Sequence, residues 1–132
     1  MNKNIVLLFV LFVYQTAAAQ HKSISMNTFE TQLQTPLGSK LERSTKKTQK
    51  MLLVDVRTSE EFLEGHIPGA KNIDWFSKDF SAAFKGMKKR QKIYVYCRSG
   101  KRSAKAAALL DSLGFKRVVN LLGGYKAYQE LK

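Results

Sequence analysis

Short apolar runs alternate with segments of helical periodicity along most of the chain. Residues 51–54, 72–74, 93–96 and 115–120 each contain large apolar side chains, many of them β-branched or aromatic, which is typical of short strands. The run 93–96 is apolar or aromatic throughout, as expected for a strand buried on both faces of a parallel sheet. Because predicted strands and helices alternate, right-handed β–α–β connections are expected. The pattern therefore predicts an α/β fold with a central parallel sheet flanked by helices.

Helical patterns fill the segments between these runs. Thr58 and Glu61 have the spacing of a capping box, so a short helix is expected to begin there. A second helix begins near Arg102, where apolar residues recur every three or four positions. A last helix follows the glycine pair at 123–124. The apolar residues between the second and third runs also share one helical face, which predicts a further helix packed on the core through Phe76, Phe80, Ala83, Phe84 and Met87.

Residues 1–19 have the pattern of a secretory signal peptide. Lys3 is followed by a nearly continuous apolar run at 5–14 and then by small residues at 17–19. We expect cleavage after Ala19 and export of the protein, with the periplasm as the expected destination. The apolar run is too short to remain as a permanent membrane anchor.

Residues 20–50 are expected to form an N-terminal segment ahead of the main core at 51–132. A short strand and helix fit the pattern between residues 21 and 34, which would place the start of the domain near residue 24. Residues 38–50 are rich in Ser, Thr and Lys, as in a surface loop. The formal net charge of +13 attracts anions. However, no aromatic residue interleaves with the basic stretch to stack bases, so no nucleic-acid partner is expected.

The only cysteine, Cys97, directly follows the predicted strand 93–96 and precedes a short basic loop and a helix. A loop of this kind turns several backbone N–H groups toward one point beside a helix N-terminus, which favours an anion. Arg98, Lys101 and Arg102 add positive charge. We therefore predict a lowered pKa and a reactive thiolate at Cys97. The alternative is that Cys97 is a small core residue, which is the commoner role of a free cysteine.

Five stretches, in this order and at this spacing, resemble the rhodanese-like sulfurtransferase domain family. The resemblance covers most of the chain from residue 51 onward and is weaker from about residue 24. The stretches are Leu53-Val54-Asp55-Val56-Arg57, Glu60-Glu61-Phe62, Gly65-His66-Ile67-Pro68-Gly69-Ala70-Lys71-Asn72-Ile73, Tyr96-Cys97-Arg98-Ser99-Gly100-Lys101-Arg102-Ser103 and Asn120-Leu121-Leu122-Gly123-Gly124.

The resemblance implies a small rhodanese-like α/β domain in which Cys97 carries a transferable sulfur as a persulfide. It implies that Asp55 and Arg57 support the pocket, and that a cradle for the persulfide and its donor is formed by Arg98, Ser99, Gly100, Lys101, Arg102 and Ser103. The donor would be a small sulfur anion such as thiosulfate, or a persulfide. No second cysteine exists to take the sulfur, so the acceptor is expected to be cyanide, a small thiol or the thiol of another protein.

No metal or organic cofactor is expected for this reaction. His21 and His66 are far apart in the sequence and lack further ligands at a useful spacing.

Three other functions are possible for a chain with a cysteine in a basic loop. Cysteine phosphatases and arsenate reductases also place a thiolate in an anion loop, but their loops are one residue longer than the four residues between Cys97 and Arg102. A non-catalytic binding module of the same family would not need the cysteine and the basic loop. A thiol redox protein is disfavoured because there is no C-x-x-C pair.

Overall fold

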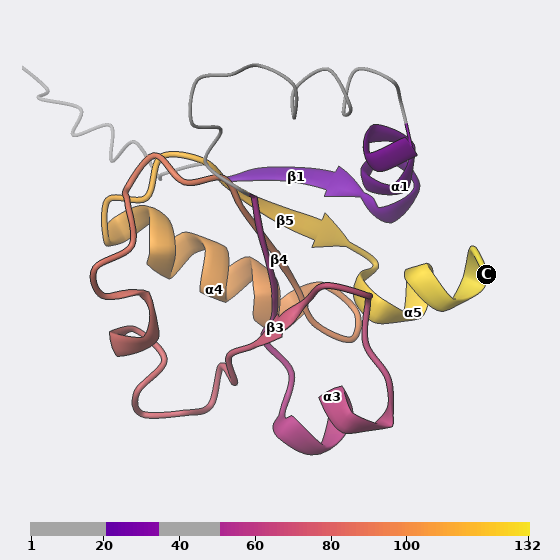
Figure 1. Ribbon diagram of the computed structural model, residues 1–132, viewed down its shortest axis with the longest axis horizontal. Helices are drawn as coiled ribbons and strands as arrows, with labels where there is room; N and C mark the ends of the chain where they lie inside the picture. The colour runs from indigo at the N-terminus through magenta and orange to yellow at the C-terminus, as the bar shows by residue number, and fades with distance from the viewer. Residues whose placement is uncertain (1–20, 35–50) are drawn as a thin grey trace, which may run out of the picture.

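The computed structural model describes residues 21–34 and 51–132, which form an α/β domain built on a parallel sheet (Figure 1). In the described residues, five parallel strands lie in the order β1-β5-β4-β2-β3. The strands are β1 (Lys22–Ser25), β2 (Leu52–Asp55), β3 (Lys71–Asn72), β4 (Ile93–Tyr96) and β5 (Val118–Leu122). The helices are α1 (Met26–Gln34), α3 (Ser59–Glu64), α4 (Lys101–Ser112) and α5 (Gly124–Glu130), with a 3₁₀ turn at Ala82–Phe84. This architecture confirms the predicted fold class.

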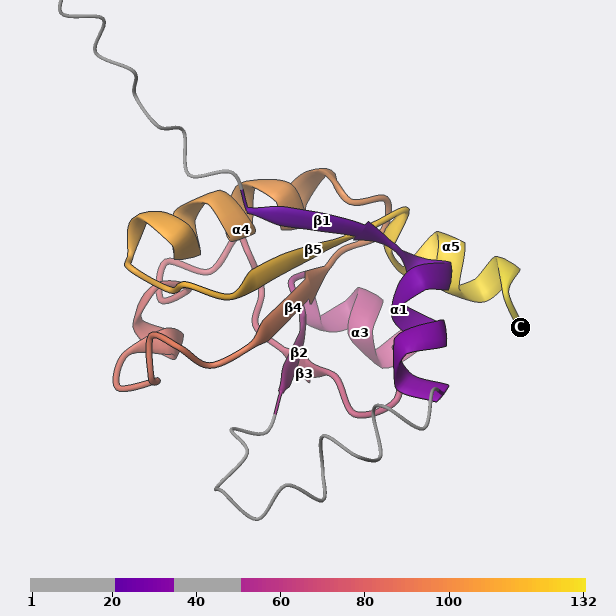
Figure 2. The same cartoon turned by 90° about the horizontal axis from the view of Figure 1, so that it is seen from above.

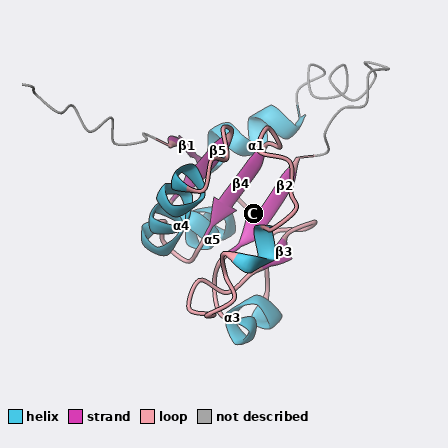
Figure 3. Cartoon of the chain, turned by 90° about the vertical axis from the view of Figure 1, so that its left-hand side faces the viewer, coloured by secondary structure: helices cyan, strands magenta, loops and turns pink. Residues whose placement is uncertain are grey.

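The sheet is covered on both faces, as its apolar strands require. Successive residues of β4 alternate between two clusters: Ile93 and Val95 pack with α4, whereas Tyr94 and Tyr96 pack with α1 and the start of α5. Figure 3 shows α4 alongside one face of the strands. Figure 2 shows α1 at the carboxyl end of β1, on the other side of the sheet from α4.

The described part of residues 20–50 belongs to the same sheet. Strand β1 pairs in parallel with β5, for example Lys22 with Val119, and α1 buries Met26 and Phe29 completely. The predicted strand and helix between residues 21 and 34 are thus confirmed. The predicted signal peptide (1–19) and the basic stretch 38–50 lie outside the described residues.

The predicted helix between the second and third apolar runs is wrong. Residues 74–91 form a series of turns that contains only the 3₁₀ segment Ala82–Phe84. Phe80 and Phe84 are buried in the core, as expected for packing residues, but Phe76 is 67% exposed. Side chains of the segment cap the turns locally, because Asp74 Oδ1 accepts a hydrogen bond from the Phe76 amide, and such bonds compete with helix formation.

The other predicted helices are present. Thr58 and Glu61 make both hydrogen bonds of the capping box at the start of α3, and α4 runs from Lys101 to Ser112. Helix α4 carries Ala106, Ala107 and Leu110 into the core. None of the helices in the described ranges is both long and apolar enough to cross a membrane.

Candidate active site

Cys97 lies at the carboxyl end of β4, the central strand of the sheet. Its side chain is only 1% exposed. The chain turns sharply after it, with Gly100 at φ 104°, and α4 begins at Lys101. The positive φ suits glycine, since a Cβ would be strained there. Open parallel sheets bind ligands at the carboxyl ends of their strands. Cys97 therefore lies where such a site is expected, as the sequence predicted.

Two donors converge on the sulfur of Cys97. The amide nitrogen of Gly100 lies 3.1 Å from Sγ, and the hydroxyl oxygen of Ser103, in the first turn of α4, lies 3.5 Å from Sγ. The same hydroxyl also lies 3.1 Å from the carbonyl oxygen of Gly100. Because Ser103 has one hydroxyl hydrogen, it can serve either acceptor, and a negative charge on Sγ would draw it to the sulfur.

These donors act on the pKa of Cys97 against the effect of burial. Burial alone would raise it, but hydrogen bonds from the Ser103 hydroxyl and from the amides of Ser103, Gly100 and Ser99 lower the pKa of Cys97 overall. The direction agrees with the sequence-based prediction. The hydrogen bonds therefore stabilise the thiolate of Cys97 against the effect of burial.

Replacing Ser103 by alanine should raise the pKa of Cys97, because it removes a side-chain hydroxyl donor to Sγ. The midpoint of iodoacetamide alkylation plotted against pH should move to higher pH, and alkylation below the midpoint should slow several-fold. Ser112→Ala is the matched control, since Ser112 lies at the other end of α4 and its hydroxyl donates to the Leu109 carbonyl. An unchanged midpoint in Ser103→Ala would show that the hydroxyl does not serve the thiolate.

The start of α5 holds the loop that follows Cys97. The amide of Tyr125 donates to the Cys97 carbonyl at 2.8 Å, and the amide of Lys126 donates to the Arg98 carbonyl at 3.1 Å. This close approach requires Gly124, where φ is +55° and a Cβ would collide with the carbonyl oxygen of Cys97 and lie 2.8 Å from the carbonyl carbon of Arg98. The glycine pair after β5 therefore fixes the backbone of the cysteine loop.

Asp55 and Arg57 form a buried ion pair at the carboxyl end of β2. Arg57 Nη2 lies 2.7 Å from Asp55 Oδ2, and the two side chains are 5% and 0% exposed. Arg57 also donates to the Gly65 carbonyl at 2.6 Å and lies 4.2 Å from the centre of the Tyr125 ring. Burial opposes the guanidinium charge, but the hydrogen bonds and charge of Asp55 raise the pKa of Arg57 overall. The pair joins β2 to the turn at Gly65 and to α5, and its predicted support of the pocket around Cys97 stays a prediction.

The three cations predicted for the cradle have different surroundings. The side chain of Arg102 makes a bidentate ion pair with Glu61 of α3, with nitrogen–oxygen distances of 2.7 and 2.8 Å. Arg98 and Lys101 are exposed and form no ion pair within the described residues. The sequence places Glu61 in a capping box and in a family stretch, but it does not predict the ion pair of Glu61 with Arg102. The two residues are 41 positions apart, and their spacing does not indicate that they meet.

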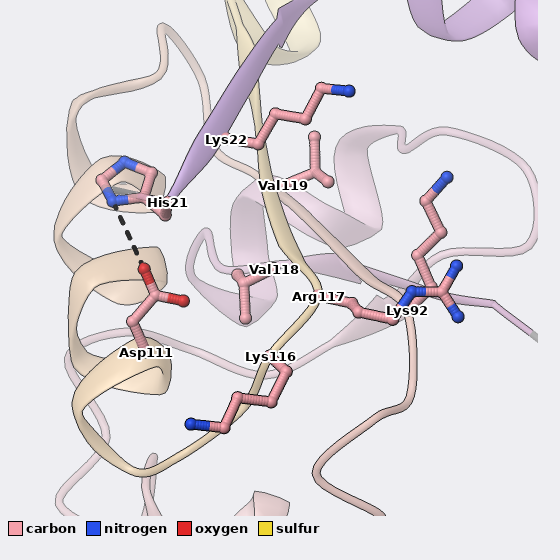
Figure 4. Close-up of a pocket in the computed structure, with 8 residues that line it drawn as sticks. All are labelled: His21, Lys22, Lys92, Asp111, Lys116, Arg117, Val118 and Val119. Atoms are coloured by element: carbon pink, nitrogen blue, oxygen red, sulfur yellow. Dashed lines mark ion pairs between the residues drawn. The ribbon is translucent and has the colours of Figure 1, made fainter. Parts of the chain in front are cut away.

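A separate pocket lies at the amino ends of β1, β4 and β5, at the opposite end of the strands from Cys97 (Figure 4). Its volume is about 360 Å³, and its wall includes the cations Lys22, Lys92, Lys116 and Arg117 together with His21 and Asp111. Figure 4 shows the amino groups of Lys22 and Lys116 pointing in opposite directions. The cations do not converge on one point, and the pocket contains none of the residues around Cys97.

Residues 39–131 match the family model of the rhodanese-like domain. The chain belongs to the rhodanese-like domain family. This rhodanese-like protein is 38% identical over 81 residues to a sulfurtransferase of Allochromatium vinosum, a match that covers 61% of this chain and 74% of the relative. The predicted family resemblance is thus confirmed.

Solved structures of the rhodanese-like family have the same fold. A rhodanese-like domain protein from Staphylococcus aureus is 30% identical, with a TM-score of 0.63, and the match covers 81% of this chain and 90% of that one. The human single-domain sulfurtransferase TSTD1 is 26% identical, with a TM-score of 0.61, and the match covers 86% of this chain and 99% of that one.

Proposed function

We propose that this rhodanese-like protein is a sulfurtransferase that carries sulfane sulfur as a persulfide on Cys97. The observation that carries the proposal is the convergence of the Gly100 amide and the Ser103 hydroxyl on Sγ at the carboxyl end of the central strand. The lowered pKa of Cys97 and the names of the relatives, which are sulfurtransferases, support it.

The proposed reaction is a double displacement with a covalent intermediate. The Cys97 thiolate attacks the outer sulfur of thiosulfate, a sulfur–sulfur bond forms, and the donor's own sulfur–sulfur bond breaks as sulfite leaves with its electron pair. Cyanide then attacks the outer sulfur of the persulfide, and thiocyanate leaves as the Cys97 thiolate is restored. The hydrogen-bond donors to Sγ act in both steps. In the first step they keep the attacking sulfur as a thiolate, and in the second they stabilise the Cys97 thiolate as it leaves.

A small sulfur anion fits the charges at the mouth of the site. Arg98 and Lys101 flank the loop with exposed side chains, and the amides around Cys97 favour negative charge. We therefore propose thiosulfate or a low-molecular-weight persulfide as donor. Because the chain has one cysteine, the acceptor is external: cyanide, a small thiol or the thiol of a partner protein.

We further propose that the protein acts outside the cytoplasm. The support for this is the signal-peptide pattern of residues 1–19. Sulfur transfer would explain why an exported protein keeps a free cysteine.

The function is tested by turnover of two substrate classes. The protein should convert thiosulfate and cyanide to thiocyanate and sulfite, and it should leave an aryl phosphate unhydrolysed. Hydrolysis of the phosphate in place of thiocyanate formation would favour a cysteine phosphatase. Inactivity toward thiosulfate and persulfide donors would favour a binding module of the same fold.

A further inference from the structure

Arg102 is the one cation of the cysteine loop motif whose charge is already paired within the described residues. Its guanidinium binds both carboxylate oxygens of Glu61, at 2.7 and 2.8 Å, and the two side chains are only 22% and 26% exposed. Bidentate pairs of this kind are the strongest ion pairs that arginine forms. An incoming anion therefore meets an arginine that is already neutralised.

Glu61 is held in place independently of Arg102. Its carboxylate accepts a hydrogen bond from the Thr58 amide at 3.1 Å, and its own amide donates to the Thr58 hydroxyl at 3.3 Å. The capping box thus fixes the Glu61 carboxylate relative to α3. The hydrogen bonds and charge of Arg102, together with the Thr58 amide, lower the pKa of Glu61 to about 2, so Glu61 carries its negative charge at neutral pH.

Arg102 also interacts electrostatically with Cys97. After its pair with Glu61, the charge and hydrogen bonding of Cys97 raise the pKa of Arg102 further. Phe76 covers another part of the guanidinium, whose carbon lies 5.8 Å from the centre of that ring. Arg102 lies in the first turn of α4 beside Ser103, whose hydroxyl is 3.5 Å from Cys97 Sγ, and its guanidinium binds the carboxylate of Glu61 in α3.

We propose that Glu61 is a specificity-determining residue that sets the charge preference of the site for its donor. By offsetting the charge of Arg102 beside Cys97, it weakens the binding of dianions such as thiosulfate relative to donors that carry less negative charge. Capture of an anion then depends on the unpaired cations Arg98 and Lys101. The inference rests on the proposed function for its substrate class, but the charge preference exists at the site whatever the reaction.

Glu61→Gln tests the proposal without removing the fold of α3. Glutamine serves in capping boxes as glutamate does, so the helix start is kept and only the charge is lost. Glu60→Gln is the matched control, because Glu60 is the preceding residue of the same helix, is exposed and makes no ion pair in the described ranges. Both variants change the net charge of the protein by the same amount.

Turnover should respond to the charge of the donor. In Glu61→Gln, kcat/KM should rise about three- to tenfold for thiosulfate, a dianion, and less for methanethiosulfonate, a monoanion, since a Coulombic energy scales with the charge of the ligand. The gain should shrink as salt is added. Glu60→Gln should stay within about twofold of the wild type, as expected for an exposed charge.

A binding measurement separates this inference from the proposed function. Sulfate should protect Cys97 from alkylation by the neutral reagent iodoacetamide, and in Glu61→Gln the protective sulfate concentration should fall about three- to tenfold. Methanesulfonate, a monoanion, should show a smaller change. This readout needs no sulfur transfer, so it holds even if thiosulfate is not a substrate. Protection by sulfate that is equal or weaker in Glu61→Gln than in Glu60→Gln overturns the proposal.

Discussion

Replacement of Cys97 by serine is expected to lower kcat/KM for sulfur transfer by at least about a thousandfold, as losses of catalytic nucleophiles do. The hydroxyl has a far higher pKa than the thiol, and the donors that surround Sγ stabilise an anion without removing a proton. A serine oxygen also forms no persulfide. Steady-state production of thiocyanate from thiosulfate and cyanide measures the loss directly.

The fold should survive the change at Cys97. Serine is close in size to cysteine, and its oxygen can accept the hydrogen bond that the Gly100 amide makes with Sγ. The thermal unfolding midpoint of Cys97→Ser should therefore stay within a few degrees of the wild type. Residual activity above about one per cent in a folded Cys97→Ser protein would contradict the assignment of the nucleophile.

Asp55→Asn is expected to destabilise the protein by about 3–5 kcal/mol, because it leaves the buried guanidinium of Arg57 without its counterion. Four hydrogen bonds join Arg57 to the Asp55 carboxylate, one of them from the backbone amide of Arg57. The amide of asparagine offers one acceptor oxygen and no charge. The free energy of unfolding, measured with urea, gives the size of the effect.

Two further variants keep this prediction specific. Asp79→Asn, at an exposed position, should change the free energy of unfolding by less than about 0.5 kcal/mol. The double variant Asp55→Leu/Arg57→Met should recover much of the loss, because replacing both buried charges by apolar groups is often neutral. Equal stability of Asp55→Asn and Asp79→Asn would show that the buried pair does not hold the end of β2.

Strands β2, β4 and β5 were predictable because they are short, mainly apolar and largely buried. The alternation of Ile93 and Val95 with Tyr94 and Tyr96 between two core clusters is a local property of period two. The capping box of Thr58 was predictable for the same reason, since its partners are three residues apart. These features depend on neighbours in the sequence.

The segment around Phe80 was not predictable from its spacing. Phe80 packs on Trp75 and Phe84, with ring centres 5.0 and 5.2 Å apart, and turns bring these rings together as well as a helix would. Gly86, at φ 83°, follows the one 3₁₀ turn. Hydrophobic spacing alone therefore does not distinguish a helix from a series of turns with buried aromatic rings.

The local features of the site were predictable, but the contacts between segments that are distant in the sequence were not. Cys97 at the end of a strand, with a glycine and a helix after it, can be read directly from the sequence. The ion pair of Arg102 with Glu61 and the amides of α5 bound to the carbonyls of Cys97 and Arg98 arise only when α3, α4 and α5 meet at one edge of the sheet. Their geometry is a product of the tertiary fold.

The most direct test of the proposed chemistry is the intact mass of the protein after exposure to thiosulfate, followed by addition of cyanide. The account predicts that the wild type gains the mass of one sulfur atom on Cys97, that cyanide removes it, and that Cys97→Ser gains nothing. A wild-type protein that gains no sulfur from thiosulfate or from glutathione persulfide, or that gains it equally in Cys97→Ser, would contradict the account.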